Sequence, residues 1–100
     1  MRNHLSLILS SVREEIAATR AALDRARQRL ADRAGVLDDC RLRMLLAETP
    51  LAGRQLHLAE EEHRRTRHEV VRLEATLVDL VAEEISVRAR LQEPAVGPGT

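Results

Sequence analysis

The stretch "HLAEEEHRRTRH", residues 57–68, holds the densest set of side chains in the chain that could do chemistry. Glu60 and His63 form an E-x-x-H pair, which places a carboxylate and an imidazole on one face of a helix. Di-iron four-helix bundles use two such pairs together with a carboxylate from each remaining helix. The residues expected opposite this segment, Arg33 and Val36, supply no carboxylate. We therefore predict a polar layer here and no metal site.

The neighbouring stretch "RRTR", residues 64–67, raises the possibility of a phosphate-binding patch. It follows three glutamates at 60–62, which cancel most of its field. The expected i,i+4 ion pairs are Glu60–Arg64 and Glu61–Arg65. The whole chain balances 16 basic against 16 acidic residues and has no aromatic ring to stack on a base. We therefore expect no binding of nucleic acid.

Catalytic groups are also sparse. Cys40 is the only cysteine, so no disulfide can form within the chain, and a reducing cytoplasm is the expected location. We interpret Cys40 as a small core residue, because no histidine with an orienting third group accompanies it. Gly-rich phosphate loops, zinc-ligand spacings and Ser/His/Asp sets are absent from the sequence. We expect no enzyme, no cofactor and no small-molecule substrate.

The first half of the chain shows a heptad pattern of long helices. Large apolar residues recur every seven positions, and mostly small residues fall between them. The first set is Leu9, Ile16, Leu23, Leu30, Leu37 and Met44, and the second is Val12, Thr19, Ala26, Arg33, Cys40 and Ala47. The pattern already runs through the apolar stretch at the N-terminus, so we expect a helix over 4–46 and no signal peptide there. No apolar run approaches the roughly 20 residues of a membrane span.

The second half repeats this pattern and predicts a helix over 50–92. Thr49 precedes Pro50, so it is disfavoured in the α region and can cap the next helix, while Pro50 suits the first helical position. A turn at 47–49 is short enough to require antiparallel helices. The predicted fold is therefore all-α, an antiparallel two-helix hairpin of the coiled-coil type within residues 1–92. Residues 93–100, rich in Pro and Gly, are expected to be a disordered tail.

The short turn also predicts the register of the two helices. Facing residues should have numbers that sum to about 96, which places Cys40 opposite Leu56 and Leu37 opposite Ala59. The ion pairs expected across the seam are Arg41–Glu60, Arg27–Glu74 and Arg29–Glu69. Farther from the turn, Arg13 is expected near Arg88, a contact between like charges. That mismatch suggests that something besides the hairpin arranges this end.

Apolar residues outside the seam point to binding surfaces, because contiguous exposed apolar patches mark interaction sites. Val71, Val78 and Ile85 form a second stripe with seven-residue spacing, and Val81 lies beside it. We interpret this stripe as a self-association surface that forms a dimeric four-helix bundle, with a groove for a different protein as the alternative. Leucines also crowd the turn. They are Leu42, Leu45, Leu46, Leu51 and Leu58, and either a partner protein or a second copy can cover them.

The function favoured by these patterns is a non-enzymatic adaptor that docks a partner protein through apolar surface outside its seam. Two alternatives rest on resemblance. The hairpin resembles Gre-type factors, which insert a hairpin into RNA polymerase and carry an acidic pair at its tip. The corresponding acidic residues here are Glu48, with Asp38 and Asp39 about two turns back. The hairpin is also similar to the secreted WXG100 family, with "LAG" at 51–53 in place of the Trp-x-Gly turn.

Overall fold

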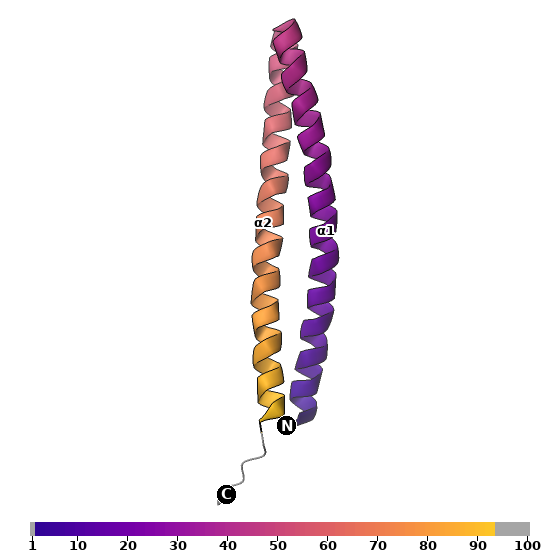
Figure 1. Ribbon diagram of the computed structural model, residues 1–100, viewed down its shortest axis with the longest axis vertical. Helices are drawn as coiled ribbons and strands as arrows, with labels where there is room; N and C mark the ends of the chain where they lie inside the picture. Colours follow the sequence, from indigo (N-terminus) through magenta and orange to yellow (C-terminus); the bar gives the residue numbers. More distant parts are fainter. Residues whose placement is uncertain (1, 94–100) are drawn as a thin grey trace, which may run out of the picture. The chain divides into compact units, whose positions relative to one another are not determined.

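A computed structural model describes residues 2–93. Those residues form two helices and no strand: α1 spans Arg2–Ala47 and α2 spans Pro50–Gln92. The helices pack against each other as an antiparallel hairpin (Figure 1), so the predicted fold class is confirmed. Compared with the predicted bounds, α1 begins two residues earlier and ends one residue later. The predicted tail lies outside the described residues except for its first residue.

Two residues make the turn, and each has a defined role. The Glu48 N–H donates to the Met44 carbonyl oxygen at 3.0 Å, and Glu48 has a φ of 48°, so α1 ends in a left-handed cap. The Ala52 N–H donates to the Thr49 Oγ1 at 3.1 Å, which makes Thr49 the N-cap of α2 as predicted. The Thr49 carbonyl oxygen accepts the Gly53 N–H at 3.0 Å. The chain therefore reverses direction within Glu48 and Thr49, and no longer loop joins the two helices.

The hairpin divides into two compact units, which are described separately. The turn unit comprises residues 22–74 and contains the connection between the helices. Its core cluster consists of Leu37, Cys40 and Ala59, with Leu56 packed against them. These are the facing residues that the predicted register brings together, and Cys40 is the small core residue that the sequence indicated.

The terminal unit comprises the described residues on either side of the turn unit, 2–21 and 75–93. Val12, Ile16 and Leu80 form its buried cluster. Partly buried apolar residues complete this cluster: Ile8, Leu77 and Val81. Ile16 and Leu80 also obey the predicted register, so the same heptad rule organises both units.

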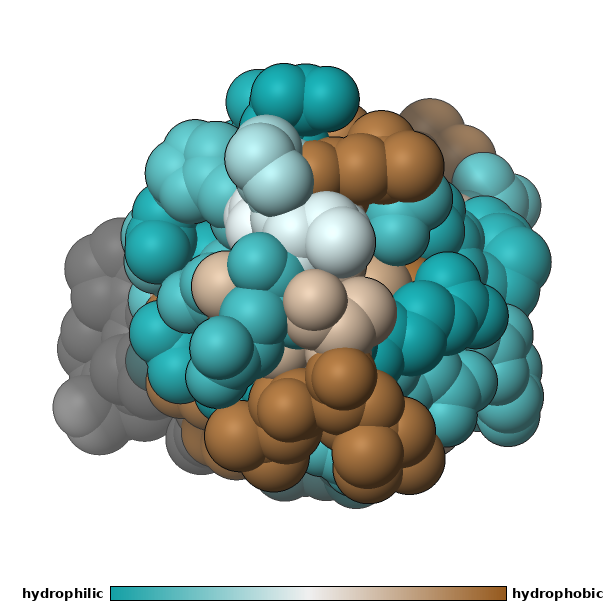
Figure 2. Space-filling view, turned by 90° about the horizontal axis from the view of Figure 1, so that it is seen from above, coloured by the Kyte–Doolittle hydropathy of each residue, from teal (hydrophilic) through white to brown (hydrophobic). Residues whose placement is uncertain are grey.

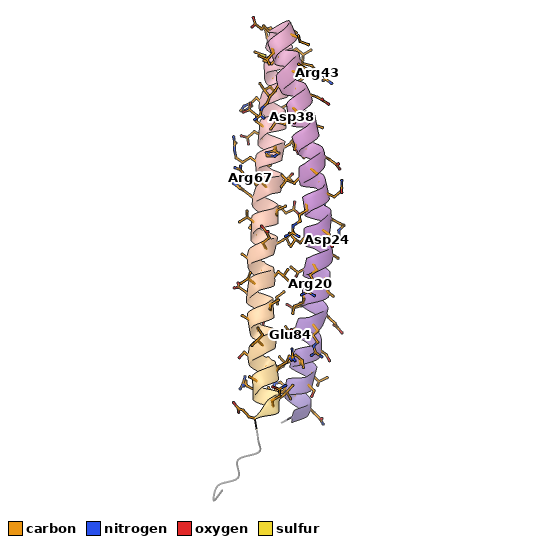
Figure 3. All side chains as sticks on the ribbon, in the orientation of Figure 1. Arg20, Asp24, Asp38, Arg43, Arg67 and Glu84 are labelled. Carbon is orange, nitrogen blue, oxygen red and sulfur yellow. The ribbon has the colours of Figure 1, made fainter. Side chains whose placement is uncertain are left out.

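Both units are held by a narrow apolar seam. Side chains of α1 and α2 fill the space between the two ribbons within each unit (Figure 3). Only Ala26 is completely inaccessible to solvent among the core residues. Thr66 is buried, and its hydroxyl donates to the Glu62 carbonyl oxygen at 2.9 Å. Arg33, which the heptad pattern assigned to the seam, is exposed instead, because its guanidinium reaches out to Glu62.

Cross-helix ion pairs confirm part of the predicted charge pattern. Arg27 pairs with Glu74 at 3.3 Å and Arg29 with Glu69 at 2.7 Å, as expected. The prediction for Arg41 was wrong, since it pairs within α1. Its partner is Asp38, at 3.7 Å.

Two further ion-pair predictions were wrong. Arg13 meets Glu84 at 3.2 Å and not a like charge, because Glu84 sits one helical turn before Arg88 and faces the seam. In the arginine-rich stretch, Arg64 pairs with Glu61 at i,i+3 spacing. The i,i+4 pairs expected there do not form among the described residues.

Candidate protein-binding surface

The leucines around the turn lie at the ends of both helices and are exposed to solvent. They fall in the last two turns of α1 and the first turns of α2, on positions outside the buried seam. All five are exposed, and Leu45 and Leu46 are the most so, at 76% and 79%. The set is Leu42, Leu45, Leu46, Leu51 and Leu58. Figure 2 looks down on this end and shows apolar residues gathered at two places around a less apolar centre.

A groove runs along one side of the seam in the turn unit. Its first part, nearest the turn, is bordered by Leu46 and Leu51. The second part shares Arg43 and Gln55 with the first and has a volume of about 300 Å³. Its floor is the buried pair Cys40 and Ala59, and its walls include Val36 and Leu58.

The groove continues into a third part that is rich in arginine. This part shares Arg33 and Glu62 with the second, has a volume of about 780 Å³, and is lined by both helices. Its charged lining residues are Arg29, Arg33, Glu62, Arg65, Glu69 and Arg72. Two arginines are engaged across the seam, Arg29 with Glu69 and Arg33 with Glu62 at 3.7 Å. Among the described residues, neither Arg65 nor Arg72 forms a salt bridge, so this end of the groove carries unbalanced positive charge.

The E-x-x-H stretch lies on α2 within the turn unit. Glu60 is exposed and His63 is half-buried. Within residues 2–93, no group of three or more His, Cys, Asp and Glu side chains is placed to hold a metal ion. Asp38, one of the acidic residues near the turn, pairs with Arg41.

The residues predicted for self-association fall into both units. Val71 belongs to the turn unit, where it is exposed and lines the arginine-rich part of the groove. In the terminal unit Val78 and Ile85 are 69% and 60% exposed. Val81 differs from them, since it is half-buried against the core cluster of that unit.

Two exposed apolar residues were missed by reasoning from the sequence. Val36 is 46% exposed and forms part of the groove wall. It precedes the core residue Leu37 at the heptad position that flanks the seam, and this position was the available signal. Leu7, also exposed, lies in the terminal unit.

No helix in the described part of the chain has a stretch apolar enough to cross a membrane. Comparison of the sequence with models of protein families, with curated proteins and with solved structures found no match.

Proposed function

We propose that the chain is a non-enzymatic adaptor that binds another protein through the apolar surface at its turn. The observation that carries this proposal is the exposure of all five leucines around Glu48 and Thr49. The hydrogen bonds that close the turn come from backbone groups and the Thr49 hydroxyl, and no leucine side chain takes part in them. A cytoplasmic location belongs to the same proposal and is supported by a single free cysteine.

The energetics of leucine burial support this assignment. Covering an exposed leucine side chain completely contributes about 1.5–3 kcal/mol from removal of apolar surface from water. Leu45 and Leu46 are mostly exposed in the isolated hairpin, so most of this free energy would be gained only when a partner covers them. A partner that covers a few of these side chains gains enough to offset much of the entropy lost on association.

Affinity purification tests this function. The full chain, immobilised through its C-terminus, is incubated with extract from its native host, and bound proteins are identified by mass spectrometry. We expect one protein to be retained in near-stoichiometric amount and to be displaced by added free hairpin. If no retained protein is displaced by the free hairpin, the adaptor function is wrong.

Self-association is a second proposal, carried by Val78 and Ile85 in the terminal unit. A second copy that covers these residues gives a dimeric four-helix bundle. The pairing of Arg13 with Glu84 removes one earlier reason for this idea, since Arg13 meets a carboxylate there and not the like charge that was predicted. The exposed apolar pair remains its only support.

Light scattering of the purified chain at micromolar concentration measures its mass in solution. A dimer is expected, and Val78→Glu with Ile85→Glu should convert it to a monomer that keeps its helicity. A wild-type monomer at these concentrations contradicts self-association and leaves the two side chains for a foreign partner.

A further inference from the structure

We propose that the groove of the turn unit binds an amphipathic helix whose one half is apolar and whose other half is acidic. This inference rests on the proposed function and names the chemistry of the partner. It requires a groove of the right shape, an apolar section, and a charged section that the hairpin leaves unbalanced.

The shape of the groove suits a helix better than a small molecule. It lies open along the seam between two antiparallel helices, which is where a third helix packs in a bundle. From Arg29 to Leu46 it follows α1 for about 26 Å, the length of a helix of about 18 residues. The small side chains of Cys40 and Ala59 in the floor permit a close approach.

The section of the groove nearest the turn carries its large apolar side chains, with Arg43 as a charged residue in the same lining. Leu46 and Leu51 border it at one end, and Val36 and Leu58 wall it farther along. All four are exposed in the hairpin. A helix with apolar residues at i, i+3, i+4 and i+7 places one stripe against such a surface.

The charged section of the groove indicates which charge the other half of the partner helix carries. Four guanidinium groups and two carboxylates line it, so two positive charges remain after the carboxylates pair with Arg29 and Arg33. Arg65 and Arg72, seven residues apart on α2, lie on the same face of that helix. Glutamates or aspartates on the bound helix, about two turns apart, meet these two groups.

A second copy of the chain fits this surface poorly. In a twofold contact the same patch lies on both sides. With the two turns at the same end, Arg65 and Arg72 face their own counterparts. With the turns at opposite ends, the arginines of one copy face the apolar section of the other. Nucleic acid does not account for the apolar section, because its phosphates bind to charged side chains. The chain also has no aromatic ring on which bases could stack.

Two synthetic helical peptides of about 18 residues test the proposal. Both carry leucines in an a/d pattern over one half. On the same face of the other half, the acidic probe carries glutamates and the basic probe carries arginines at identical positions. Binding of each fluorescent probe to the full chain is measured by anisotropy at low salt, with duplex DNA of about 20 base pairs as a third ligand.

The acidic probe is expected to bind about tenfold more tightly than the basic probe, because two exposed ion pairs each contribute modestly. Arg65→Glu with Arg72→Glu should reverse this preference. The matched control is Arg54→Glu with Arg67→Glu, two exposed arginines of α2 that lie outside the groove and change the net charge equally. The control should keep the preference. Val36→Glu with Leu58→Glu should abolish binding of the acidic probe.

Several results overturn the proposal: equal binding of both probes, no binding of either, reversal by the control variant, or competition by the DNA duplex. Circular dichroism of each variant confirms that it remains helical. These results are separable from the adaptor function itself. If the host protein is still captured and the probes show no preference, the adaptor function stands and the acidic-helix assignment fails.

Discussion

At the scale of single residues, the turn shows both what sequence reasoning predicts and what it misses. The cap at Thr49 follows from its type and from the proline after it, and the structure confirms it. The left-handed conformation of Glu48 has no comparable signal, because glycine or asparagine normally occupies that position. Closing the chain within two residues forces Glu48 into a conformation that costs a non-glycine residue about 1–2 kcal/mol.

Glu48→Gly should therefore stabilise the hairpin. Glycine relieves the left-handed conformation, while greater freedom of the unfolded chain offsets about 0.4–1 kcal/mol of that gain. We expect the free energy of unfolding in urea, followed by circular dichroism, to rise by about 0.5–1 kcal/mol. Glu48→Ala separates loss of the carboxylate from relief of the backbone and should not stabilise. Equal effects of the two substitutions contradict this reading of the turn.

At the scale of elements, the heptad pattern predicted both helices and their register because it is long and uninterrupted. Leu37, Cys40 and Ala59 meet as the short turn requires. The ion pairs were predicted less well. Long arginine side chains reach several carboxylates one turn apart, so small differences in rotamer decide between them. That is why Arg41 turns to Asp38 and Arg13 to Glu84.

Leu37→Ala tests whether the seam carries the stability of the turn unit. Leu37 is buried in a cluster of small neighbours, so its loss leaves a cavity that the helices can only partly close. We expect the free energy of unfolding to fall by about 2–5 kcal/mol. Leu45→Ala, an exposed change on the same helix, should alter it by less than about 0.5 kcal/mol. Similar losses for the two variants contradict this account, because the exposed apolar surface then contributes as much to the stability of the unit as the seam does.

At the scale of the whole molecule, charge and apolar surface are distributed differently from what the composition suggests. Acidic and basic residues balance over the chain, yet three arginines that line the groove of the turn unit, Arg43, Arg65 and Arg72, form no salt bridge among the described residues. The exposure of the leucines around the turn was predicted from their heptad positions alone. The predicted register already set Val36 opposite the stretch that contains Leu58, but the groove that the two side chains wall was not predicted, because a register gives no account of the space left between side chains.

The central claim is that the leucines at the turn bind a partner and do not hold the fold. The most direct measurement compares capture of the host protein by the wild-type chain and by Leu46→Glu with Leu51→Glu. Glutamate is unfavourable at the end of α1 and favourable at the start of α2, so the two effects on helix stability nearly cancel. Leu7→Glu with Ala18→Glu, at exposed sites in the terminal unit, adds the same charge as a control. We predict that the turn variant keeps its helicity and melting temperature within a few degrees and loses capture, while the control retains it. A turn variant that unfolds, or one that folds and still captures the partner, contradicts the claim.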